Sequence, residues 1–175
     1  MKHPQTRSIV VAAPTTEEYS MEIKELLVPN AVKINLKATS KKQVLQELAK
    51  MAVGLTGLNE RDILNVLIER ERLGTTGVGE GVAIPHAKLE GADRLCAVFA
   101  RLESPIDFDS VDDEFVDLIF LLLAPLSPEH THLKALAKIS RLLRNKSMCA
   151  KLRGGTSTDA LYALLTQPTE NKNID

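Results

Sequence analysis

VDLIFLLLA (residues 116–124) is nearly all apolar, with Asp117 as its one charged residue. Such a run is typical of a strand at the centre of a sheet, where both faces are covered by other elements. It is about half as long as a bilayer-spanning helix, so we expect no membrane insertion. The rest of the chain must then supply helices for both faces of a sheet.

Further strands are predicted on either side of this run. LESPIDFDSVDDEFV (residues 102–116) favours a hairpin, which would pair residues 95–102 with the central strand in antiparallel fashion. The alternation in residues 31–36 and the short apolar run 82–84 each favour a strand, whereas LGTTGVGEG (residues 73–81) is predicted to be a loop. A hairpin combined with intervening helices predicts a mixed sheet.

Helical spacing occurs before and after these strands. The expected helices follow Ser40, Asn59 and Thr131, and two shorter ones span residues 147–153 and 158–165. Ser40 is part of a Ser-x-x-Gln capping box, and the expected caps of the next two helices are Asn59 and Thr131. We therefore predict an α/β fold in which helices flank both faces of a mixed β-sheet.

Length and composition are those of one folded domain. The 175 residues are 44% hydrophobic and 26% charged, which is ordinary globular usage. We assign the domain to residues 21–166, an N-terminal tail to 1–20 and a C-terminal tail to 167–175. A net charge of −1 gives no general attraction to nucleic acid. Two isolated cysteines fit a reducing cytoplasm.

The glycines between residues 74 and 81 do not match a nucleotide-binding loop. A P-loop needs Lys-Ser or Lys-Thr after its last glycine, but Val82 follows Gly81. A dinucleotide fingerprint lies between a strand and a helix, and this loop has the opposite order. These glycines are therefore interpreted as residues that permit tight turns.

His86 is the strongest candidate for chemistry. Pro85 fixes its own φ and restricts Ile84 to an extended conformation, so the imidazole is carried by a stiff backbone. An isolated histidine is often structural, but a neutral imidazole can attack through one nitrogen while a hydrogen bond fixes the other. Phosphoryl transfer suits such a group if nearby donors and cations bind the charged oxygens.

His132 and Arg70 are candidates for those donors and cations. His132 would lie in the first turn of a helix, where free N–H groups attract anions. Arg70 ends the second helix and could bind phosphate oxygens, although a surface ion pair with Glu69 or Glu71 is an equal alternative. A zinc site of His86, His130 and His132 is disfavoured, because residues i and i+2 of a helix point apart.

Three separated stretches together resemble a known family: ERERLGTTGVGEGVAIPHAKL (69–89), SPIDFDSVDDEFVDLIFLLLAP (104–125) and HLKALAKISRLLRN (132–145). They are similar, in the same order, to the type 2 IIA components of the bacterial phosphoenolpyruvate-dependent phosphotransferase system. Within this mannitol/fructose class the chain looks most like the nitrogen-regulatory members. The resemblance covers about residues 21–166.

The resemblance implies that His86 accepts a phosphoryl group on Nε2 from a phosphohistidine of an HPr-like carrier protein. Arg70 and His132 match the residues that orient or stabilise it, and Glu80 matches an acidic position of mannitol-type members. Thr76 and Gly79 are further candidates for lining the site. The resemblance implies no cofactor and no metal.

The same resemblance implies a regulatory phosphocarrier whose targets include potassium transporters and sensor kinases. The alternative is a sugar-committed IIA component that passes its phosphoryl group to a cysteine of a IIB domain. A third hypothesis, a binding module that is never phosphorylated, is disfavoured because Arg70, His86 and His132 are all present.

Overall fold

The computed structural model describes residues 21–127 and 130–168. The predicted tail at 1–20 lies outside these ranges, as do residues 169–175 of the C-terminal one. Within the described part, no helix has both the length and the apolar character needed to span a bilayer.

The described strands form one mixed sheet, as predicted. The strands are β1 (Val32–Leu36), β2 (Gly77–Gly79), β3 (Val82–Ala83), β4 (His86–Lys88), β5 (Cys96–Ile106) and β6 (Val116–Ala124). Their order is β1-β5-β6-β3-β2, and β4 also pairs with β6. The β5–β6 pair is antiparallel, whereas β1 pairs with β5, and β3 and β4 pair with β6, in parallel.

β6 is the central strand that the apolar run predicted. Every residue from Leu118 to Ala124 is buried. Phe120 lies opposite Phe99 of β5, and the two rings meet edge to face with centroids 6.0 Å apart. Complete burial of a large apolar side chain contributes about 1.5–3 kcal/mol, so each large side chain of this strand stabilises the core substantially.

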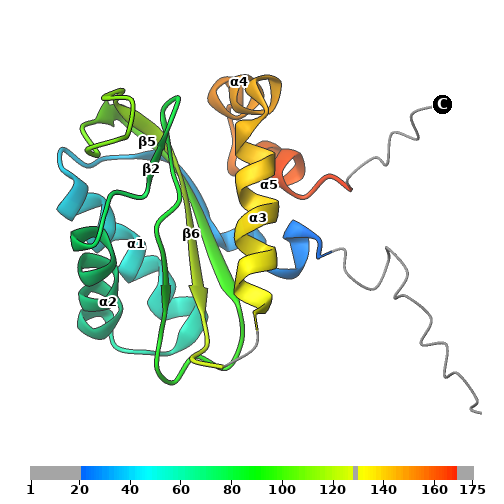
Figure 1. Ribbon diagram of the computed structural model, residues 1–175. Coiled ribbons are helices and arrows are strands. Elements are labelled where there is room, and N and C mark those ends of the chain that lie inside the picture. Colours follow the sequence, from blue (N-terminus) through cyan, green and yellow to red (C-terminus); the bar gives the residue numbers. More distant parts are fainter. Residues whose placement is uncertain (1–20, 128–129, 169–175) are drawn as a thin grey trace, which may run out of the picture.

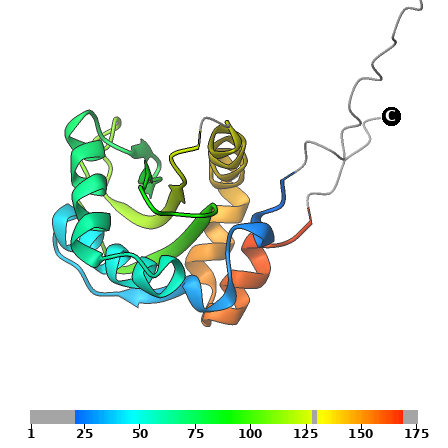
Figure 2. The ribbon, with the colours of Figure 1, turned by 90° about the horizontal axis from the view of Figure 1, so that it is seen from below.

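Helices cover both faces of the sheet. They are α1 (Lys41–Thr56), α2 (Glu60–Arg72), α3 (Thr131–Arg144), α4 (Lys146–Gly154) and α5 (Thr158–Leu165), and two short 3₁₀ turns span Ile23–Glu25 and Pro29–Ala31. Figures 1 and 2 show α1 and α2 on one side of the sheet and α3, α4 and α5 on the other. This is the helix/sheet/helix arrangement that the sequence predicted.

The helix starts follow their capping residues in most cases. Ser40 accepts a hydrogen bond from the Gln43 N–H at 3.2 Å, and Asn59 accepts one from the Arg61 N–H at 2.9 Å. The prediction that Thr131 caps α3 is wrong, because α3 begins at Thr131 itself and His130 is the N-cap, without a side-chain hydrogen bond.

Parallel pairing with β6 resumes after Pro85. Ala83 of β3 pairs with Ile119 and His86 of β4 pairs with Leu122, so the register along β6 is the same before and after Pro85. Pro85 has no N–H, but its carbonyl accepts the Leu122 N–H at 3.0 Å. The predicted loop 73–81 also contains a short strand, β2. His86 is therefore held by the sheet rather than by a free loop.

Candidate functional site

The imidazole of His86 is held by a backbone carbonyl two residues earlier. Its Nδ1 lies 2.8 Å from the Ile84 carbonyl oxygen, and the side chain is partly buried. A carbonyl oxygen can only accept, so this bond requires the proton on Nδ1. In the neutral ring the lone pair is then at Nε2, which is the nitrogen available for attack.

His86 lines a pocket of about 210 Å³ between α2, β4, β6 and α3. Arg70 comes from the end of α2 and His132 from the start of α3. The structure thus brings together the three residues that the sequence singled out first. The full lining is Arg70, His86, Ala87, Lys88, Leu122, Ala124, His132 and Leu136.

Arg70 does not form the surface ion pair that was its alternative role. In the described part of the chain, the carboxylate of Glu69 pairs with Arg72, and that of Glu71 pairs with Lys41 at 2.8 Å. Arg70 instead donates from Nη1 to the carbonyl of Gly74 at 2.9 Å. This bond holds the guanidinium at the pocket wall and leaves its other N–H groups available to an anion.

His132 is the second residue of α3 and is partly buried. Backbone N–H groups in the first turn of a helix lack partners within the helix, and the helix dipole favours an anion there. The ring of His130, the capping residue, lies 6.4 Å from that of His132, centroid to centroid. Across residues 21–127 and 130–168, no group of three His, Cys, Asp or Glu residues could hold a metal ion.

Glu80 and Gly79 lie away from the His86 pocket. Both line a different hollow of about 610 Å³, together with Ile84 and with Arg144 and Lys146. The Glu80 backbone has a φ of 55°, and its carboxylate is 3.7 Å from the ammonium group of Lys146. Their contribution to the chemistry at His86 stays a prediction.

The turn at Glu80 is fixed by contacts with distant segments. Asp112 accepts the Glu80 N–H at 2.8 Å, and Arg153 donates to the Glu80 carbonyl at 3.0 Å. The backbone N–H groups of Glu80 and then Glu114 lower the pKa of Asp112 below its ordinary value, because they stabilise the carboxylate. These contacts fix the backbone of Glu80, whose carboxylate lies near Lys146 at the start of α4.

Thr76 is also absent from the wall of the His86 pocket. Only 3% of it is exposed, and its hydroxyl and N–H both donate to the carboxylate of Glu71. Its carbonyl, however, accepts the N–H of Ile84 at 2.9 Å. Thr76 therefore contacts the segment that carries His86 and not the pocket itself.

Lys88 is a pocket residue that the sequence reasoning missed. His86 and Lys88 lie on the same face of β4, because side chains alternate along a strand. Had residues 86–88 been interpreted as a strand, this alternation would have placed Lys88 on the same face as His86. Ala87 lies in β4 and is not among the residues with positive φ, so its side chain causes no strain there.

Comparisons with known proteins identify the family to which the chain belongs. The family described as "Phosphoenolpyruvate-dependent sugar phosphotransferase system, EIIA 2" matches residues 25–167. The chain belongs to this family, and so to the IIA components of phosphotransferase systems.

Within this family, the chain is similar to nitrogen regulatory proteins. The chain is 53% identical to the "Nitrogen regulatory protein" of Bradyrhizobium diazoefficiens, over 85% of this chain and 97% of that protein. The crystal structure of nitrogen regulatory protein IIA-Ntr from Neisseria meningitidis is 33% identical, with a TM-score of 0.79, and the match covers 82% of this chain and 99% of that one. A fructose-specific EIIABC component of Bacillus subtilis is 32% identical over 84% of this chain and 23% of its own length.

Proposed function

We propose that the protein is a phosphohistidine carrier that accepts a phosphoryl group on Nε2 of His86 from an HPr-like protein. The observation that carries this proposal is the 2.8 Å contact between His86 Nδ1 and the Ile84 carbonyl, in a pocket shared with Arg70 and His132. It leaves the attacking nitrogen unprotonated and beside two groups suited to phosphate oxygens.

The transfer step balances without an added reactant. The Nε2 lone pair of His86 forms a bond to phosphorus, while the N–P bond of the donor phosphohistidine breaks and its electron pair returns to the donor nitrogen. Nδ1 of His86 keeps its proton and still donates a hydrogen bond to the Ile84 carbonyl. The product is therefore a phosphorylated imidazolium. Arg70, the α3 N-terminus and Lys88 would stabilise the charged oxygens during the transfer.

The phosphorylated protein would act mainly as a regulator. A phosphoryl group adds negative charge at a partly exposed pocket, which changes the proteins that can bind there. The relatives named nitrogen regulatory protein support this role. Potassium transporters and sensor kinases are the targets that the resemblance suggests, and the cytoplasm, where an HPr-like donor would be found, is the expected location.

A sugar-committed role is the second candidate function. The similarity to the fructose-specific component of Bacillus subtilis favours it. In this role the phosphoryl group would pass from Nε2 of His86 to a cysteine thiolate of a IIB domain on another chain. The two roles share the first step and differ in the second.

One experiment separates these possibilities. The protein is incubated with phosphoenolpyruvate and the upstream carrier proteins, and an acid-labile phosphoryl group is sought in the native chain and in His86→Ala. We expect label on the native chain only. If an upstream system of proven activity leaves the native chain unlabelled, both roles fail. Rapid onward transfer to a sugar-specific IIB protein would favour the second role.

A further inference from the structure

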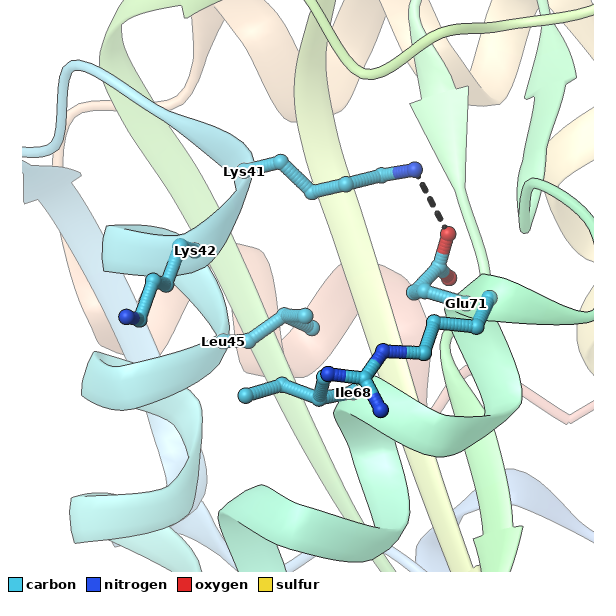
Figure 3. Close-up of a pocket in the computed structure, with 6 residues that line it drawn as sticks. Lys41, Lys42, Leu45, Ile68 and Glu71 are labelled. Atoms are coloured by element: carbon cyan, nitrogen blue, oxygen red, sulfur yellow. Dashed lines mark ion pairs between the residues drawn. The ribbon is translucent and has the colours of Figure 1, made fainter.

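Glu71 has a nearly buried carboxylate beside the site but outside the His86 pocket. Only 7% of its side chain is exposed. Figure 3 shows this carboxylate pointing toward the ammonium group of Lys41 from α1, and the two groups are 2.8 Å apart. The same ammonium lies 4.8 Å from the ring centroid of Phe108. A buried carboxylate is costly without such partners, so its position is closely constrained.

The carboxylate of Glu71 also fixes Thr76. It accepts the Thr76 N–H at 3.3 Å and the Thr76 hydroxyl through its other oxygen. The backbone of Glu71 takes part in the same corner, since its carbonyl accepts the Gly74 N–H at 3.2 Å. Gly74 in turn accepts the hydrogen bond from Arg70. Glu71 thus organises the segment between the arginine of the pocket and Thr76.

From Thr76 a chain of hydrogen bonds leads to the imidazole. The Thr76 carbonyl accepts the Ile84 N–H at 2.9 Å, and the Ile84 carbonyl accepts the His86 Nδ1–H at 2.8 Å. Ile84 is 3% exposed, and Pro85 after it limits its backbone to extended conformations. The place of the Ile84 carbonyl therefore depends on where Thr76 is held.

We propose that Glu71 is a positioning residue for His86. It acts through Thr76 and Ile84 to keep the proton on Nδ1 and the lone pair on Nε2. The consequence for phosphoryl transfer rests on the proposed function above, but the effect on the imidazole does not. Without the Glu71 carboxylate, the Ile84 carbonyl shifts, and the Nε2–H tautomer, which cannot attack through Nε2, becomes more populated.

The test measures the tautomer of His86 by nitrogen NMR on the full-length protein labelled with ¹⁵N-histidine. In the native protein we expect the Nδ1–H form to predominate, and in Glu71→Ala the Nε2–H form to rise. Phosphoryl acceptance from the HPr-like carrier should fall by about tenfold or more, since misplacement by about 1 Å can cost about a hundredfold. Glu71→Gln keeps an acceptor for the Thr76 N–H and should restore the native tautomer.

The matched control is Glu69→Ala. Glu69 is 67% exposed and pairs with Arg72, so its loss should change neither tautomer nor rate. An unchanged tautomer in Glu71→Ala, or an equal change in Glu69→Ala, would overturn the proposal. If Glu71→Ala does not fold, Thr76→Val removes the hydroxyl bond alone and must shift the tautomer in the same direction. If the native protein accepts no phosphoryl group, the proposed function fails, and the tautomers still decide the role of Glu71.

Discussion

Replacement of Arg70 by methionine tests whether this side chain binds the transferred group. The change removes the guanidinium and retains an unbranched stem. In the structure, the guanidinium donates to the Gly74 carbonyl at 2.9 Å and lies at the wall of the pocket that contains His86. Its other N–H groups are the ones expected to meet phosphoryl oxygens.

The size of the effect follows from the bonds that are lost. A hydrogen bond to a charged group contributes about 1.5–3 kcal/mol, and about 1.4 kcal/mol corresponds to a factor of ten. Loss of one such bond in the transition state should slow phosphoryl acceptance by about 10- to 100-fold. The bond to Gly74 is exposed, so the free energy of unfolding should fall by less than about 1.5 kcal/mol.

The assay is a single-turnover transfer from a phosphorylated HPr-like carrier, with urea unfolding in parallel. Arg72→Met is the matched control, because Arg72 is exposed, pairs with Glu69 and does not line the His86 pocket. The reasoning is refuted if Arg70→Met transfers at the native rate, or if Arg72→Met is slowed equally.

Three further predictions concern stability and reactivity. Gly81→Ala should lower the free energy of unfolding by about 1–3 kcal/mol in urea titrations. The reason is that φ of Gly81 is +78° and an added Cβ would lie 2.5 Å from the Arg153 guanidinium. An unchanged free energy of unfolding would contradict this geometry. Phe120→Ala should cost about 3–5 kcal/mol, because Phe120 is fully buried in β6, and a loss below about 1 kcal/mol would argue against that packing. Burial raises the pKa of the thiols of Cys96 and Cys149. At neutral pH a thiol reagent should therefore label these cysteines only after unfolding. Rapid labelling of the native protein would contradict their burial.

The parts of the fold that could be predicted are those set by local pattern. β6 spans Val116–Ala124 as predicted, because its run of apolar residues is a local pattern that the sequence shows directly. α5 likewise spans Thr158–Leu165 as predicted. The start of α3 was misplaced by one residue, because a threonine at the first helical position resembles a capping threonine in sequence.

β4 could not be predicted in the same way. Pro85 interrupts the apolar pattern, so no strand was predicted for the residues that follow it, beginning with His86. The strand exists because β6 supplies partners in an unbroken register, from Ile119 opposite Ala83 to Leu122 opposite His86. Pairing with a segment so distant in the chain leaves no local trace in residues 86–88.

The sequence indicated some residues of the candidate site, and long-range contacts again explain the others. Arg70, His86 and His132 lie at element ends that the fold brings to one pocket. Glu80 follows a local turn whose direction depends on Asp112 and Arg153, and these contacts are invisible in the sequence of the turn. Long-range hydrogen bonds therefore fix the backbone of Glu80, which lines a hollow other than the His86 pocket.

The most direct test of the central claim is to locate the phosphoryl group on the histidine ring. The protein, labelled with ¹⁵N-histidine, is phosphorylated by its upstream carrier and studied by nitrogen and phosphorus NMR. We predict a phosphorus–nitrogen coupling to Nε2 of His86 and no such signal in His86→Ala. Nδ1 should still carry its proton and donate a hydrogen bond to the Ile84 carbonyl. Phosphorylation on Nδ1 of His86, or on His132 in its place, would contradict the account.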